Sequence, residues 1–367
     1  MLKMSELVAH IISSLETVDD VSSCALVARR WTHPAQSQLF SEVCVSGPSV
    51  QLRPPSRLLE LFGQSPHLAR LVSALLIHSL DEIDPIELER LSNIAYPRLM
   101  RLEFQGSTLI LSSQTLPFFR RMLSRPTLTS VTMRFQFFEA QEPCLDMWKD
   151  CSRNIRHLAL VTFIPKFHHP ASSKSKRIVL DSVSCLGGLS AWLGDPRCPF
   201  DASQLRAIQC KSLGPLPPNL LEAAQNTVEI VSIYAPASAF DSKIDLSPFT
   251  QITQLDLAFG TSLQCAIEVI KTISHSARNR IVAIRFFLFA LRPEPSIRED
   301  LGRWMPEIFE LLPKLKILVI GGDAWMPTRM RNLVEQSSPF PPAVEVRWDS
   351  SGQCETKRMW YASIRGL

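Results

Sequence analysis

The sequence predicts an α/β protein in which a small N-terminal helical unit precedes a solenoid of strand-plus-helix repeats. Three observations support this class. Apolar residues recur at helical spacing in the first 45 residues, one strand-like pattern returns many times after them, and amphipathic helices lie between its copies. A strand followed by a helix, repeated along a chain, builds a curved solenoid.

The composition excludes several classes of protein. Of the 367 residues, 46% are hydrophobic and 20% charged, which excludes a largely disordered chain. The net charge of +4 is too dilute for a nucleic-acid-binding surface. The most apolar stretch, Ile281 to Leu291, is too short to span a membrane and is expected to be a buried strand. An acid at Glu6 argues against a secretory signal, so we expect a cytoplasmic or nuclear protein.

Neither an enzyme nor a metal site is indicated. The nine cysteines are odd in number and scattered without a Cys-x-x-Cys pair, so they are expected to be small buried hydrophobes. The usual nucleotide-binding, serine-hydrolase and zinc-protease motifs are absent. The adjacent His168 and His169 indicate a loop, since neighbouring side chains diverge. We predict no catalytic residue, no metal and no cofactor.

Three short helices are expected in the first 45 residues. The first presents one apolar face at the 3.6-residue period, made of Leu7, Val8, Ile11, Ile12 and Leu15. The second, capped by Asp19 or Asp20, carries Val21, Cys24, Val27 and Trp31 and ends near His33. The third begins at Pro34, because proline suits the first turn of a helix.

A proline-punctuated connection follows these helices. It contains one short helix, from Arg57 to Phe62. We therefore expect a helical domain at 1–45, a linker at 46–67, a repeat domain at 68–350 and a C-terminal tail at 351–367.

In the repeat domain, apolar residues recur at positions 1, 4 and 6 of one short pattern. The fourth-position residues are Leu75, Leu102, Val131, Leu158, Ile208, Val231, Leu255, Ile284 and Leu318. The one long gap contains a further strand-like segment at 177–183, which gives a mean spacing of about 27 residues. This is the strand pattern of a leucine-rich repeat. The ninth position lacks the usual asparagine or cysteine, so the solenoid should be irregular.

Helices are expected between these strands. Ser296 to Glu299 forms a capping box, and Leu263, Ala266, Ile267 and Ile270 form an apolar stripe.

Positions 3, 5 and 7 of each strand should form the concave face, because side chains alternate along a strand. We expect this face to bind a target protein. Its candidate residues are Arg101, Glu103, Arg134, His157, Lys211, Tyr234, Gln254, Asp256, Arg285 and Phe287. Mixed charges with a few aromatic residues suit a protein or peptide rather than a nucleic-acid backbone.

The N-terminal helices also match an ordered motif. The matching residues are Glu6, Leu7, Ile11, Ile12, Leu15, Asp20, Val21, Cys24, Val27, Arg29 and Trp31. In this order and spacing they resemble an F-box, and residues 35–43 resemble the segment that follows it in fungal F-box-like proteins with leucine-rich repeats. Lys3 and Met4 stand where the family has Leu-Pro, and Ala28 stands where it has cysteine or serine.

The resemblance implies the substrate-recognition subunit of a Skp-cullin-F-box ubiquitin ligase, which acts in ubiquitin-dependent degradation without catalysis of its own. The implied partners are a Skp adaptor, a cullin scaffold and a target protein. The residues expected to bind the adaptor, or to form the core beneath that surface, are Leu7, Ile11, Ile12, Leu15, Val21, Val27 and Trp31.

Two alternatives remain at this stage. In the first, the chain is a leucine-rich-repeat interaction scaffold, and its first 45 residues only cover the open end of the solenoid. In the second, it is a hydrolase or transferase with a site that no local motif reveals, which predicts a deep pocket lined by titratable side chains.

Overall fold

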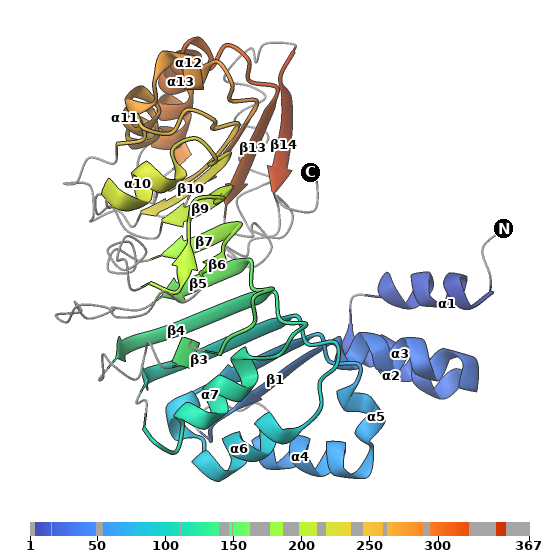
Figure 1. Ribbon diagram of the computed structural model, residues 1–367. Helices are drawn as coiled ribbons and strands as arrows, with labels where there is room; N and C mark the ends of the chain where they lie inside the picture. The colour runs from blue at the N-terminus through green and yellow to red at the C-terminus, as the bar shows by residue number, and fades with distance from the viewer. Residues whose placement is uncertain are drawn as a thin grey trace. The chain divides into compact units, whose positions relative to one another are not determined.

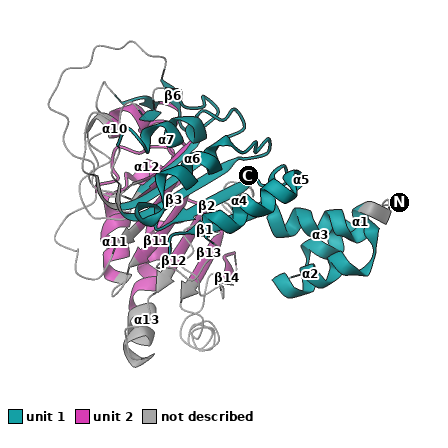
Figure 2. Cartoon of the chain, turned by 90° about the horizontal axis from the view of Figure 1, so that it is seen from below, with its two compact units in different colours: residues 1–180, 196–201 teal, residues 181–195, 202–367 magenta. Residues whose placement is uncertain are grey.

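The computed structural model describes residues 4–15, 17–48, 54–109, 112–138, 147–148, 150–161, 177–185, 198–210, 218–235, 245–259, 263–288, 294–322 and 343–349. The chain divides into two compact units, 1–180 with 196–201 and 181–195 with 202–367, coloured separately in Figure 2. Both units combine parallel strands with helices, which confirms the α/β class.

Unit 1 begins with three helices and continues into alternating strands and helices (Figure 1). Its helices are α1 (Met4–Ser13), α2 (Val18–Val27), α3 (Arg29–Ser41), α4 (Pro55–Gln64), α5 (Pro66–Ala69), α6 (Pro85–Asn93) and α7 (Leu116–Leu123), with a 3-10 turn at Leu80–Glu82. Its strands are β1 (Glu42–Ser46), β2 (Ala74–His78), β3 (Arg101–Leu109), β4 (Ser130–Phe138), β5 (His157–Val161), β6 (Ile178–Val179) and β8 (Phe200–Asp201). Strands β1 to β5 pair in parallel in chain order, and β6 pairs with β8.

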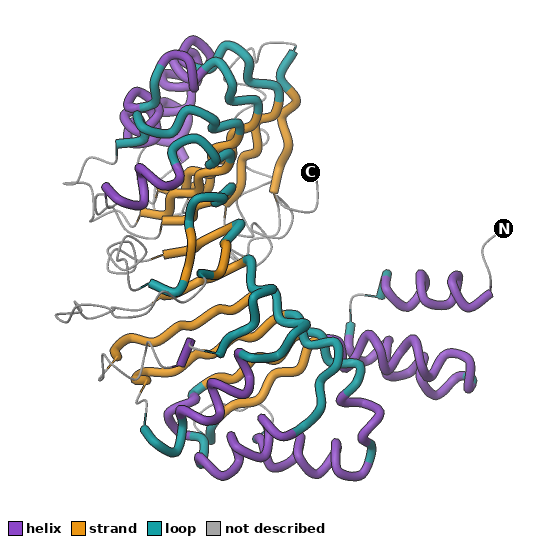
Figure 3. The backbone as a smooth tube through the Cα atoms, in the orientation of Figure 1, coloured by secondary structure: helices purple, strands orange, loops and turns teal. Residues whose placement is uncertain are grey.

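Unit 2 repeats the same architecture. Its strands are β7 (Ser182–Cys185), β9 (Ala207–Cys210), β10 (Ile230–Ala235), β11 (Gln254–Phe259), β12 (Ala283–Leu288), β13 (Ile317–Gly322) and β14 (Glu345–Asp349), all parallel and adjacent in that order. Its helices are α10 (Pro218–Ala224), α11 (Leu263–Thr272), α12 (His275–Arg278) and α13 (Glu294–Leu311). Figure 3 shows these helices gathered on one side of the strands.

The strand register aligns the predicted fourth-position residues within each unit. In unit 1 the fourth-position residues Leu75, Leu102, Val131 and Leu158 stand opposite one another across β2 to β5. In unit 2 the same holds for Val183, Ile208, Val231, Leu255, Ile284 and Leu318 across β7 to β13. Val183 supplies the copy expected in the long gap. Two copies were not predicted, because β1 aligns Val43 with Leu75 and β14 aligns Val346 with Leu318.

The core lies between strands and helices. The apolar residues at positions 1, 4 and 6 are buried, as Leu99, Leu102 and Phe104 illustrate in unit 1. Phe104 meets Phe118 and Phe119 of α7 edge to face, with ring centroids 5.9 and 5.1 Å apart. Helix α7 is therefore fixed to the sheet by aromatic packing as well as by buried area.

The residues around the predicted linker belong to unit 1. Strand β1 crosses the boundary expected at residue 45 and pairs with β2. The helix expected at 57–62 is present as the longer α4, with Leu58 and Phe62 buried. Phe62 also meets Tyr96 edge to face at 6.1 Å. This segment packs against the sheet because its apolar side chains cover the first strands. It therefore belongs to unit 1, and the division between the units follows Leu180.

The helix boundaries near the N-terminus differ from the prediction. Thr17, not Asp19 or Asp20, caps α2, and its hydroxyl accepts a hydrogen bond from the Asp20 amide at 3.1 Å. Ala28 has an extended backbone that separates α2 from α3, and α3 begins at Arg29. Pro34 therefore lies inside α3 rather than at its start.

Candidate protein-interaction surfaces

The three N-terminal helices share a small core. Val8 and Ile12 of α1, Val21 of α2 and Ala35 of α3 are buried together. Five partly buried residues pack around them: Leu15, Cys24, Ala25, Trp31 and Leu39. With so few buried side chains, this core leaves other apolar residues of the same helices uncovered.

Five large apolar side chains on α1 and α2 are exposed. We call Leu7, Ile11, Val18, Leu26 and Val27 the helical apolar patch. Among the described residues, eight large hydrophobic side chains are exposed, and these five are in the first 27 residues. Leu26 is 88% exposed, Val27 70% and Val18 65%. Scattered single apolar residues are normal on a surface, whereas a concentration of them indicates a protein contact.

The structure divides the seven residues that sequence assigned to core or adaptor contact. Ile12 and Val21 belong to the core, and Leu15 and Trp31 pack against it. Leu7, Ile11 and Val27 are exposed and belong to the helical apolar patch. Val18 was missed because it precedes the cap expected at Asp19 or Asp20, and Leu26 because it lies off the spacing of the second predicted helix.

The polar face of the unit 1 sheet contains a network of opposite charges. Arg101 contacts Glu42 at 3.4 Å and Glu103 at 3.3 Å, and Nε of Arg134 lies 3.4 Å from Glu103. The side chain of Glu103 is only 2% exposed, so the prediction of an open concave position is wrong there. His157, half-buried on β5, is the remaining target-binding candidate on this face.

These arginines have a structural explanation. A carboxylate as buried as that of Glu103 must be compensated by nearby cations and donors. The two guanidiniums flank it from its own strand and from the next strand. Their charge is therefore not free for a target protein, and we reassign Arg101, Glu103 and Arg134 to the stability of the sheet.

A second buried carboxylate lies on the polar face of unit 2. Asp256 on β11 is 3% exposed, so it too departs from the predicted open position. It accepts hydrogen bonds from Ser232 Oγ and from Gln254 Nε2, each at 3.1 Å. Arg285 is its register partner on β12. Burial raises the pKa of Asp256, and the charge of Arg285 opposes this rise only in part.

This burial makes stability depend on pH. Over the range just above the ordinary carboxyl pKa, folded Asp256 keeps a proton that the unfolded chain has lost, so stability falls as pH rises through that range. We expect Asp256→Asn to remove this component, so that the variant gains stability relative to the wild type as pH rises above the ordinary carboxyl pKa. Urea unfolding at several pH values measures the difference, and a difference that does not change with pH would contradict the assignment.

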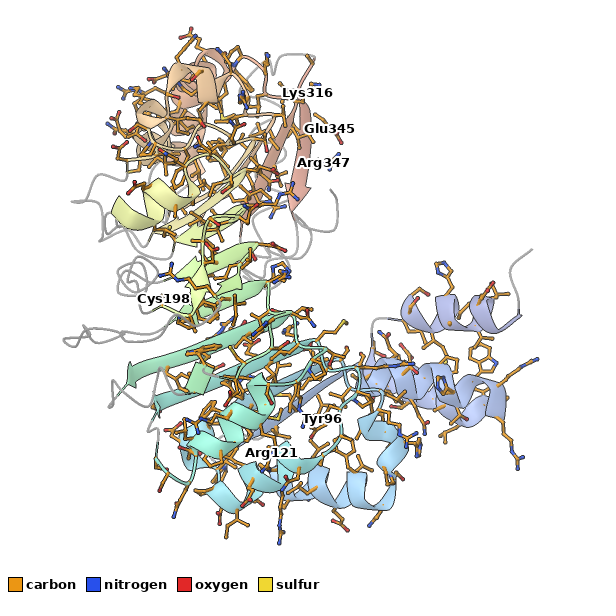
Figure 4. All side chains as sticks on the ribbon, in the orientation of Figure 1. Tyr96, Arg121, Cys198, Lys316, Glu345 and Arg347 are labelled. Carbon is orange, nitrogen blue, oxygen red and sulfur yellow. The ribbon has the colours of Figure 1, made fainter. Side chains whose placement is uncertain are left out.

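Other polar groups on this face of unit 2 are exposed or incompletely paired. Nε of Arg285 and the hydroxyl of Ser184 are buried without a hydrogen-bond partner. Arg347 and Glu345 form an exposed ion pair on β14, with Nε 2.8 Å from Oε1 (Figure 4).

Three target-binding candidates are described incompletely. Tyr234 and Phe287 lie on β10 and β12, where the structure describes their backbone alone, and Lys211 lies outside the described residues. The pair His168 and His169 also lies outside them.

The cysteines follow the prediction of small buried side chains in part. Within the described ranges, Cys198 and Cys210 are buried, Cys24, Cys44, Cys151 and Cys265 are half-buried, and none of these six is in a disulfide. Burial raises the pKa of Cys151 to about 12, so its thiolate, the reactive form, is suppressed. No group of three potential metal ligands occurs among the residues that the structure describes.

No described helix is long and apolar enough to cross a membrane.

No protein-family model matches the chain, and no curated protein sequence matches it. Its function must therefore be inferred from its own residues and their arrangement.

Proposed function

We propose that the chain is the substrate-recognition subunit of a Skp-cullin-F-box ubiquitin ligase. The observation that favours this function most is the helical apolar patch, because five of the eight exposed large apolar residues in the described part of the chain lie on α1 and α2, two helices that share a small core. Such a surface needs a partner with a complementary apolar groove. The ordered motif in the same helices indicates that this partner is the Skp adaptor.

The remainder of the chain is proposed to form an irregular leucine-rich-repeat solenoid that holds the target. Support comes from the spacing of the repeats and from the aligned fourth-position residues within each unit. Parallel strands bring equivalent side chains side by side, which creates a long surface suited to a protein. The chain would then act without bond-making chemistry, by holding a target near the ubiquitin-transferring enzyme.

Co-expression with a Skp adaptor tests this function. We expect a one-to-one complex by size-exclusion chromatography with light scattering. The double variant Ile11→Asp with Leu26→Asp places two charges in the helical apolar patch and should weaken binding at least about a hundredfold, because truncated anchors at an interface centre dominate its energy. Both side chains are exposed, so the fold should persist.

A matched control separates binding through the helical apolar patch from nonspecific binding through any exposed apolar side chain. Ile86 on α6 and Val282 before β12 are also exposed and apolar but lie outside the patch. Ile86→Asp with Val282→Asp should bind the adaptor as tightly as the wild type. A wild-type chain that stays alone, or equal loss in both double variants, would contradict the ligase function and favour an interaction scaffold whose N-terminal helices only cover the repeats.

A further inference from the structure

The segments that lead into β2, β3, β4 and β5 of unit 1 are rich in arginine. They are residues 65–73, 94–100, 124–129 and 150–156, and together they contain five arginines and one acid, Asp150. Because the strands are parallel and adjacent, all four segments meet at the amino-terminal edge of the sheet (Figure 1).

Two of the five arginines have structural roles. The guanidinium of Arg125 lies over the ring of Tyr96 at 5.0 Å and donates to the carbonyls of Ser92 and Ile94 at 2.7 and 2.8 Å. Arg156 donates through Nη1 to three carbonyls, including that of Val179 at 3.1 Å. These contacts hold turns together and leave neither guanidinium available to a ligand.

The other three arginines are exposed. Arg70, Arg98 and Arg153 precede β2, β3 and β5 at nearly the same point of the repeat, and none forms an ion pair with a described residue. Neighbouring strands lie about 4.8 Å apart, so this arginine row extends over roughly 15 Å. Met100, half exposed, lies among them and offers an apolar contact.

Charge is segregated between the two edges of this sheet. Three acids, Asp81, Glu82 and Asp84, follow β2 at the opposite, carboxyl-terminal edge. Along the edge of the arginine row the acids are Asp150 and Glu42 at the start of β1, and Glu42 already contacts Arg101 at 3.4 Å. An edge of this kind attracts an anionic partner.

We propose that the arginine row, Arg70, Arg98 and Arg153, binds an acidic segment of a protein partner. Guanidiniums pair with carboxylates in a bidentate manner, and Met100 can contact an apolar side chain of the same segment. A nucleic acid fits less well, because single strands bind on exposed aromatic side chains, and the one aromatic residue in these segments, Tyr96, is buried. This surface goes beyond adaptor binding and does not depend on it.

A fluorescein-labelled peptide of about ten glutamates provides the probe, with anisotropy measured on the full-length chain. The triple variant Arg70→Gln, Arg98→Gln, Arg153→Gln should lose roughly tenfold in affinity, the sum of three exposed charge pairs. A matched triple variant, Arg29→Gln, Arg30→Gln, Arg57→Gln, removes three exposed arginines elsewhere in unit 1 and should stay within about twofold of the wild type.

Three results would overturn the proposal. They are the absence of peptide binding by the wild type, equal loss in both triple variants, and tighter binding of a single-stranded DNA of the same length than of the peptide. Because the adaptor is absent from this experiment, failure here would leave the proposed ligase function standing, and failure of adaptor binding would leave the arginine row standing.

Discussion

Replacing Phe104 by alanine is expected to lower the free energy of unfolding by about 3 to 5 kcal/mol. Phe104, Phe118 and Phe119 are all buried, and each ring lies within 5.9 Å of the other two, centroid to centroid. Truncation at Phe104 therefore opens a cavity at the point where β3 meets α7. Rigid packing on both sides allows little collapse into that space.

Urea unfolding followed by circular dichroism measures this loss. The neighbouring variant Gln105→Ala is the control, because Gln105 is exposed on the same strand and should change stability by less than about 0.5 kcal/mol. If Phe104→Ala unfolded at the same urea concentration as Gln105→Ala, the aromatic cluster would not be a main contact between sheet and helix.

The repeat strands could be predicted because their burial follows directly from spacing. Positions 1, 4 and 6 point into the core, so the spacing in the sequence determines which residues stand side by side on adjacent strands. The first and last strands were missed for different reasons. Phe40, Val43 and Val45 fit the pattern but were assigned to the N-terminal motif, whereas Val346 and Trp348 of β14 lack the leucine-like residues of the other copies.

The roles of the N-terminal residues could not be predicted from spacing alone. Leu7 and Val8 are adjacent, as are Ile11 and Ile12, and either member of each pair fits a helical period. Only the packing of α3 against α1 and α2 determines that Val8 and Ile12 are buried and that Leu7 and Ile11 are exposed. A local pattern defines an apolar stripe, but its division into core and docking surface depends on tertiary contacts.

The polar faces of the sheets show a similar limit. Alternation along the strands correctly placed Arg101, Glu103 and Arg134 on one face, but it could not show that they pair with one another. Whether a charged side chain serves stability or recognition depends on its neighbours on adjacent strands. Parallel register brings these neighbours together from positions about 30 residues apart in the chain.

Removing both cations from this network should lower the stability of the protein. We expect Arg101→Met with Arg134→Met to lower the free energy of unfolding by about 3 to 5 kcal/mol, because Glu103 would remain buried without either flanking guanidinium. Methionine keeps most of the apolar stem of arginine, so the loss reports on charge rather than on packing. Urea unfolding of the double variant measures it.

A third substitution tests whether this loss of stability comes from the uncompensated charge of Glu103 or from other contacts of the two arginines. Adding Glu103→Leu to the double variant removes the uncompensated carboxylate and should recover most of the lost stability, since an apolar replacement of a buried ion pair is often neutral. If the triple variant were no more stable than the double variant, the arginines would stabilise the sheet through contacts other than Glu103. If the double variant itself were as stable as the wild type, the network would be free to serve recognition, and its residues would return to the target-binding surface.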